Sequence, residues 1–135
     1  PEAGKVYPSK LGYPAKATLA AADARADQFD GVVIPGGFAP DYVRRSKPML
    51  EMVRGLHARA KPLAAICHGP WVLCSTPALK GRTATGFHSI RDDMVNAGAT
   101  FLDQEVCVDG NVITSRTPND LPAFVVALMK AIQAG

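Results

Sequence analysis

Residues 63–71 read LAAICHGPW, and this stretch sets the expected fold. Its first four residues form a continuous apolar run, which is typical of a strand buried on both faces, as in a parallel sheet. The strand is expected to end at Cys67, and Pro70 is expected to lead into a helix over Trp71 to Thr76. A cysteine therefore stands at the point where a buried strand turns into a helix.

The residues around Cys67 fit a nucleophile elbow, a tight turn with small residues two positions before and two positions after the reactive side chain. Ala65 and Gly69 take those two positions. Such a turn strains the backbone and lifts one side chain clear of the sheet. Because the start of the following helix favours a thiolate, Cys67 is predicted to be a nucleophile, with His68 as its general base and the His68 amide as an oxyanion donor. The alternative is an inert, buried cysteine.

A second apolar run, residues 29–35, is followed by Gly36 and Gly37. Ligands of open α/β sheets bind at the carboxyl ends of the strands, so this turn and the cysteine turn are expected to share one rim. We assign Gly36, Gly37 and Gly69 to substrate and oxyanion binding; the alternative for the glycine pair is a plain turn. It is not a phosphate loop, because neither Gly-Lys-Ser/Thr nor GxGxxG is present.

The rest of the chain alternates strands with helices. Helices are expected over 40–45, 48–60, 90–97 and from 119 or 120 onward, strands over 16–19, 101–108 and 112–115, and a hairpin turn at 109–111. This order favours a layered α/β domain with a mostly parallel sheet. A length of 135 residues suits a single domain over 1–135.

Composition excludes several kinds of partner. The net charge of +3 is small and the basic residues of the chain are scattered, so nucleic acid is not expected as a binding partner. No apolar run reaches the roughly 18–20 residues that span a bilayer, so no membrane partner is expected. Three cysteines are too few for a disulfide framework, which favours the cytoplasm. Cys74 and Cys107 are expected to pack in the core, and His88 to lie near the rim. No CxxC or HxxxH supports a metal, and no cofactor is expected.

Several segments together resemble the ThiJ/PfpI superfamily, in particular its PfpI-type intracellular protease and deglycase branch, which has the class I glutamine amidotransferase-like fold. The matching segments are DGVVIPGGFAPD (30–41), KPLAAICHGPWVL (61–73), LKGRTAT (79–85), SIRDDMVNAGA (89–99) and DQEVCVDGNVITSRTPNDLPAF (103–124), with GKVYPSKLGYPAK near the start. They cover nearly the whole chain in order.

The resemblance implies a flavodoxin-like three-layer sandwich that assembles as a homodimer or higher homo-oligomer. It implies Cys67 as nucleophile, His68 as base, and Asp41 as an acid presented to that histidine across a subunit interface. In PfpI-type relatives this acid is often Glu, which has a longer reach than Asp41. The usual Tyr-Pro before the SIRDDM segment is replaced by Phe87-His88, which changes the corner that bears on substrate preference.

Members of the superfamily also have an opening strand, helix and strand, carrying a glutamate that hydrogen-bonds the cysteine sulfur. These are not represented in this sequence, so the domain is expected to be N-terminally incomplete. Without them an edge of the sheet and part of the core are exposed. We therefore expect that these residues alone do not form a stable, active enzyme.

The function that this predicts is a cysteine-dependent hydrolase or lyase acting on small carbonyl compounds or glycation adducts, as a deglycase or glyoxalase, or on peptides. Cys67 adds to an aldehyde to form a hemithioacetal while His68 moves protons. A non-enzymatic alternative is a stress protein that uses the same thiol as a redox sensor, or that holds unfolded proteins. A glutamine amidotransferase is disfavoured because no His-x-Glu follows Val112.

Overall fold

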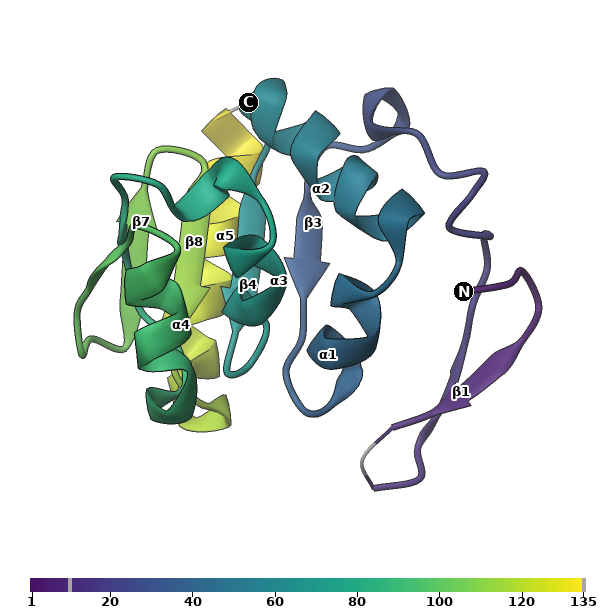
Figure 1. Ribbon diagram of the computed structural model, residues 1–135, viewed down its shortest axis with the longest axis horizontal. Coiled ribbons are helices and arrows are strands. Elements are labelled where there is room, and N and C mark those ends of the chain that lie inside the picture. Colours follow the sequence, from purple (N-terminus) through teal and green to yellow (C-terminus); the bar gives the residue numbers. More distant parts are fainter. Residues whose placement is uncertain (10, 135) are drawn as a thin grey trace.

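The computed structural model describes residues 1–9 and 11–134 and is built around one four-stranded sheet (Figure 1). The strand order is β3 (Val32–Ile34), β4 (Leu63–Ile66), β8 (Val112–Ser115) and β7 (Val106–Asp109). The first three strands run parallel, and β7 is antiparallel to β8. The predicted α/β fold with a mostly parallel sheet is confirmed.

The parallel register brings three chain segments to one edge of the sheet. Ile34 pairs with Ala65, and Ile66 pairs with Ser115. The loops that leave β3, β4 and β8 therefore begin side by side, which is where open α/β sheets bind their ligands. The glycine turn and the cysteine turn share this edge, as predicted.

Helices cover both faces of the sheet, so the domain has three layers (Figure 1). One face carries α1 (Ala39–Arg44), α2 (Lys47–Ala58), α3 (Pro70–Cys74) and α4 (Arg91–Asn96), and the other carries α5 (Leu121–Ala134). Leu56, Leu73 and Met94 are fully buried on the first face, and Phe124 packs against Ile113 on the second. Each large apolar side chain buried in this way contributes about 1.5–3 kcal/mol. Within residues 1–9 and 11–134, no helix combines the length and apolarity needed to cross a membrane.

The N-terminal segment forms a separate hairpin of β1 (Val6–Pro8) and β2 (Pro14–Lys16), followed by the 3-10 helix η1 (Ala26–Gln28). The strand predicted over 16–19 was wrong, because Lys16 is the last residue that pairs across the hairpin. The chain then runs to β3, an edge strand on which Val33 is 52% exposed.

The single strand predicted over 101–108 is two strands. Its start is β6 (Thr100–Phe101), which pairs with β5 (Thr83–Ala84), and its end is β7 in the main sheet. The hydrogen bond from the Leu102 amide to the Ala84 carbonyl holds the segment away from the main sheet until Val106. The predicted hairpin turn between β7 and β8 is confirmed, with Gly110 at φ +58°. Three more 3-10 turns are η2 (Pro77–Leu79), η3 (His88–Ile90) and η4 (Pro118–Asp120).

Candidate active site

Cys67 lies at the carboxyl end of the central strand β4 and has a backbone φ of +62°. This left-handed conformation costs a non-glycine residue roughly 1–2 kcal/mol, so the surrounding structure must impose it. The Cys67 amide donates to the Ser115 carbonyl (3.0 Å), and its carbonyl accepts from the Phe87 amide (2.9 Å). Backbone from two other segments thus holds the strained turn, and the strand-to-helix elbow predicted here is present.

Two of the predicted glycines permit this turn because they lie in tight contact with it. A Cβ at Gly36 would be 2.6 Å from the Cys67 Cβ and 3.0 Å from its Sγ. A Cβ at Gly69 would collide with the Ile34 carbonyl oxygen and lie 2.9 Å from that of Ile66. A side chain at Gly36 would therefore press on the sulfur, and one at Gly69 would separate β3 from the elbow.

Gly37 favours glycine for its backbone conformation rather than for lack of space. Its φ is +71°, and no atom lies within 4 Å of a Cβ built there. No backbone carbonyl in residues 1–9 and 11–134 accepts from the amides of Gly36 or Gly37. Gly36 lies against the His68 amide, 3.2 Å from the position of an added Cβ. The backbone at Gly36 thus borders the same space as the sulfur, and the oxyanion role of these amides remains a prediction.

The imidazole of His68 contacts the sulfur directly. Its Nδ1 lies 3.3 Å from the Cys67 Sγ, and its Nε2 lies 3.3 Å from the Ser89 Oγ. Phe87 stacks on the ring at 4.7 Å between centroids, and Trp71 meets it edge-on at 5.8 Å. His68 thus pairs with the thiol in the arrangement that a cysteine nucleophile and its base require.

The helix after the elbow is shorter than predicted. It is α3, of five residues, and its first amides are occupied: Trp71 donates to the His68 carbonyl and Val72 to the Gly69 carbonyl. A helix of barely more than one turn has a small dipole. The predicted help from the helix terminus is therefore small, and the polar side chain that contacts the sulfur is that of His68.

Ser89 was missed by the sequence reasoning, although the loop that carries it was noticed. This loop is docked by the Thr85 amide, which donates to the Thr114 Oγ1 (2.9 Å), and by the Phe87 amide bond to Cys67. No spacing rule links Ser89 to a histidine 21 positions earlier.

His88, expected near the rim, is exposed, and its ring lies 4.3 Å from that of Phe87 rather than against His68.

Asp41 lies in the first turn of α1 and is exposed. Its carboxylate forms no hydrogen bond or ion pair with another side chain in the described part of the chain, so the fold of one chain does not bring it to His68. Presentation by a second copy remains a prediction.

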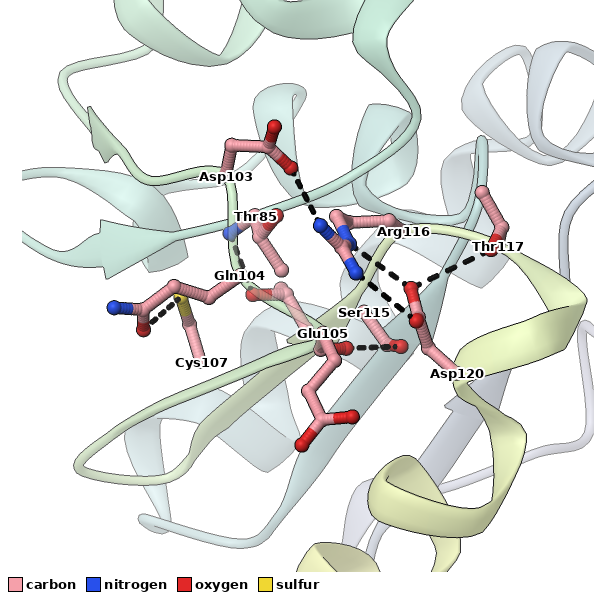
Figure 2. Close-up of polar contacts among 10 residues, drawn as sticks. Thr85, Asp103, Gln104, Glu105, Cys107, Ser115, Arg116, Thr117 and Asp120 are labelled. Carbon is pink, nitrogen blue, oxygen red and sulfur yellow. Dashed lines mark hydrogen bonds and ion pairs between the residues drawn. The ribbon is translucent and has the colours of Figure 1, made fainter.

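Arg116 leaves β8 beside the elbow and is held by two carboxylates, a second feature that the sequence reasoning missed. Figure 2 shows its guanidinium between Asp103 and Asp120. The bond to the Asp103 Oδ1 is 2.7 Å long, and the paired bonds to Asp120 are 3.0 and 3.1 Å. Hydrogen bonds from Arg116 lower the pKa of the buried Asp120. This bidentate ion pair pins the loop after β8, whose Ser115 carbonyl holds the Cys67 amide.

The other two thiols are made less acidic by burial. Burial raises the pKa of Cys74 to about 11, an effect that exceeds the opposing influence of Arg44. Burial also raises the pKa of Cys107, which is 5% exposed. Both results fit the predicted packing role. Within residues 1–9 and 11–134, no three His, Cys, Asp or Glu side chains are grouped to hold a metal ion.

We expect iodoacetamide at pH 8 to label Cys67 well before Cys74 or Cys107. Thiolate is the reactive form, and with a pKa of about 11 only about one Cys74 in a thousand is ionised at that pH. Peptide mass spectrometry after timed quenching gives the three rates. The control is the protein in urea, in which all three cysteines should react alike. Faster labelling of Cys74 than of Cys67 in the folded protein would contradict the assignment of the reactive thiol.

The sheet is mostly parallel, and its central strand β4 ends in a strained cysteine beside the glycine turn that follows β3. These features define an α/β protein with a nucleophile elbow. The model of the DJ-1/PfpI family matches residues 2–131, and the chain belongs to this family.

Individual relatives agree with this assignment. Deglycase PfpI from Pyrococcus furiosus is 44% identical over 128 residues, which is 95% of this chain and 77% of the relative. YraA from Bacillus subtilis, which is named provisionally as a cysteine protease, is 48% identical over 123 residues, 91% of this chain and 73% of the relative. Among solved structures, a two-domain protein from Anabaena variabilis with DJ-1/ThiJ/PfpI-like and ferritin-like domains superposes with a TM-score of 0.92 at 44% identity. That match covers 96% of this chain and 37% of the larger one.

Proposed function

We propose that this protein is a cysteine-dependent hydrolase or lyase that acts on small carbonyl compounds and on the adducts they form with amines. The observation that carries the proposal is the strained Cys67 with its Sγ 3.3 Å from the Nδ1 of His68. The site is half-buried, so a small substrate reaches the sulfur while the imidazole stays packed against Phe87. A relative named as a deglycase supports the substrate class.

The proposed reaction begins when the Cys67 sulfur adds to an aldehyde carbon. A C–S bond forms, the carbonyl electron pair moves to oxygen, and that oxygen takes the proton held by His68, giving a hemithioacetal. If an amine is already bound to the same carbon, the C–N bond breaks as the C–S bond forms, and the amine leaves with the proton that His68 took from the thiol. The amides near Gly36 and His68 are proposed to stabilise the charge on oxygen.

For methylglyoxal, His68 then takes the proton from the sulfur-bearing carbon, and the neighbouring carbon is protonated in turn. The product is the thioester of lactate, which water hydrolyses to lactate and the free thiol. Methylglyoxal and water together have the composition of lactate, so no external oxidant or reductant is required. A peptide carbonyl attacked by the same thiolate would use the same donors, which keeps peptidase activity within the proposal.

A homodimer or higher homo-oligomer is part of this proposal, because Asp41 can act on His68 only when it comes from another copy. The exposed side chain of Tyr42, 64% accessible, lies next to Asp41 on α1 and offers apolar surface for such a contact. Asp41 would add negative charge near the imidazolium and favour the ion pair with Cys67.

The test, made on the protein as the cell produces it, is to assay lactate formation from methylglyoxal, amine release from methylglyoxal adducts, and peptide cleavage side by side, before and after alkylation of Cys67. We expect the carbonyl activities to fall in proportion to the fraction of Cys67 that is labelled. Activity that persists after complete labelling would overturn the proposal. So would a protein that is silent in all three assays while mild peroxide oxidises Cys67 selectively, a result that favours the redox-sensor alternative.

A further inference from the structure

The hydroxyl of Ser89 faces the Nε2 of His68 at 3.3 Å, while the opposite ring nitrogen faces the Cys67 sulfur at the same distance. We propose that Ser89 is a positioning residue that fixes the tautomer of His68 by accepting a hydrogen bond from Nε2–H. This inference rests on the proposed function, since the tautomer matters only if His68 serves as the base for Cys67.

The chemistry of imidazole makes the tautomer decisive. A neutral histidine carries one ring proton, and it can accept the thiol proton at Nδ1 only if its own proton is on Nε2. After the transfer both ring nitrogens are donors, with Nδ1–H facing the thiolate and Nε2–H still facing Ser89. A serine hydroxyl accepts in both states without moving, so Ser89 keeps the Nδ1 lone pair on the sulfur side throughout the cycle.

The structure holds Ser89 in place for this role. Phe87, two residues earlier, is tied to the Cys67 carbonyl by its amide and stacks on the imidazole, so one short loop supports both the ring plane and its Nε2. The loop continues into η3, where the Ile90 amide donates to the Phe87 carbonyl (3.0 Å) and the Ile90 side chain is buried. Rotation of the His68 ring would break both the stacking and the hydrogen bond.

Ser89 and Asp41 have separable effects in this arrangement. Asp41 from a second copy supplies charge, whereas Ser89 supplies the atom that faces Nε2 within the same chain. A third group that orients the base of a nucleophile is a recurrent feature of catalytic sites, and its loss leaves the wrong tautomer populated. Here an uncharged hydroxyl takes that position.

The experiment reads the tautomer directly, by ¹⁵N NMR of the ring nitrogens in histidine-labelled protein at a pH where the imidazole is neutral. His68 is one of three histidines, and its signals are assigned by their absence in a His68→Gln variant. We expect the Nε2–H form in the native protein and a mixture with the Nδ1–H form in Ser89→Ala. Turnover of methylglyoxal should fall about 3- to 10-fold in that variant, as one lost hydrogen bond allows, and Ser89→Thr should restore both readouts. Ser46→Ala is the matched control, because the Ser46 side chain caps no helix amide.

Each outcome has a defined meaning. A native His68 protonated at Nδ1, or a Ser89→Ala protein with unchanged tautomer and turnover, would overturn the role of Ser89. A tautomer that changes in Asp41→Asn but not in Ser89→Ala would assign the role to the acid. If turnover does not depend on Cys67, the proposed function fails whatever the NMR shows. If it does depend on Cys67 and Ser89→Ala has no effect, the Ser89 inference alone fails.

Discussion

Replacing Cys67 with serine is expected to lower the turnover of methylglyoxal by about 10³-fold or more, the usual size of the loss when a covalent nucleophile is removed. A serine hydroxyl is far less acidic than a thiol, so a base at the 3.3 Å distance of His68 ionises it to a much smaller extent. The measurement is the steady-state rate of lactate formation, read together with adduct removal and peptide cleavage.

The variant should keep the native fold, because serine is close to cysteine in volume and inherits the same φ of +62°. We expect its free energy of unfolding to stay within about 1 kcal/mol of the native value. Cys107→Ala is the control, since that thiol lies in β7 away from the elbow and its loss should leave turnover within about twofold. Native rates in all three assays for Cys67→Ser would remove the sulfur from the mechanism.

The elbow was predictable because its signals are local. The run Leu63–Ile66 is apolar throughout, and all four residues are buried, as a strand covered on both faces requires. Gly69 and Gly36 each pack against the elbow, and the fold leaves no room for a side chain at either position. Periodicity and turn chemistry therefore located both loops of the site and the class of the fold.

The contacts that complete the site could not be predicted in the same way, since they join segments far apart in the chain. Ser89 reaches His68 because α4, which continues from η3, packs against α3 and the Phe87 amide binds the Cys67 carbonyl, and no short-range rule encodes that arrangement. Asp103 lies in the connection between β6 and β7, and this connection brings it to Arg116. The prediction of one strand over residues 101–108 left no such connection. Long-range pairing, rather than local preference, decides these details.

The second large effect is expected from Gly36→Ala, which adds one methyl group where the structure leaves none of the required space. Gly36 is not among the residues with positive φ, so alanine is compatible with its backbone and the conflict is purely steric. The new Cβ would start 2.6 Å from the Cys67 Cβ and 3.0 Å from its Sγ. Either the elbow or the glycine turn must shift, and overpacking of this kind costs about 1–3 kcal/mol.

A displacement of the sulfur by about 1 Å is enough to lower turnover about 10²-fold, because the reacting atoms are no longer aligned. We expect the loss mainly in kcat, with a parallel fall in the rate at which iodoacetamide labels Cys67. Gly81→Ala is the control that separates displacement of the sulfur from a general loss of stability. Its φ of +70° makes alanine cost about 1–2 kcal/mol in the free energy of unfolding. No atom lies within 4 Å of the new Cβ, however, and the residue is remote from the elbow. That variant should lose stability and keep its turnover. If Gly36→Ala also keeps its turnover, the close contact between the glycine turn and the cysteine does not position the nucleophile, and the two loops act independently.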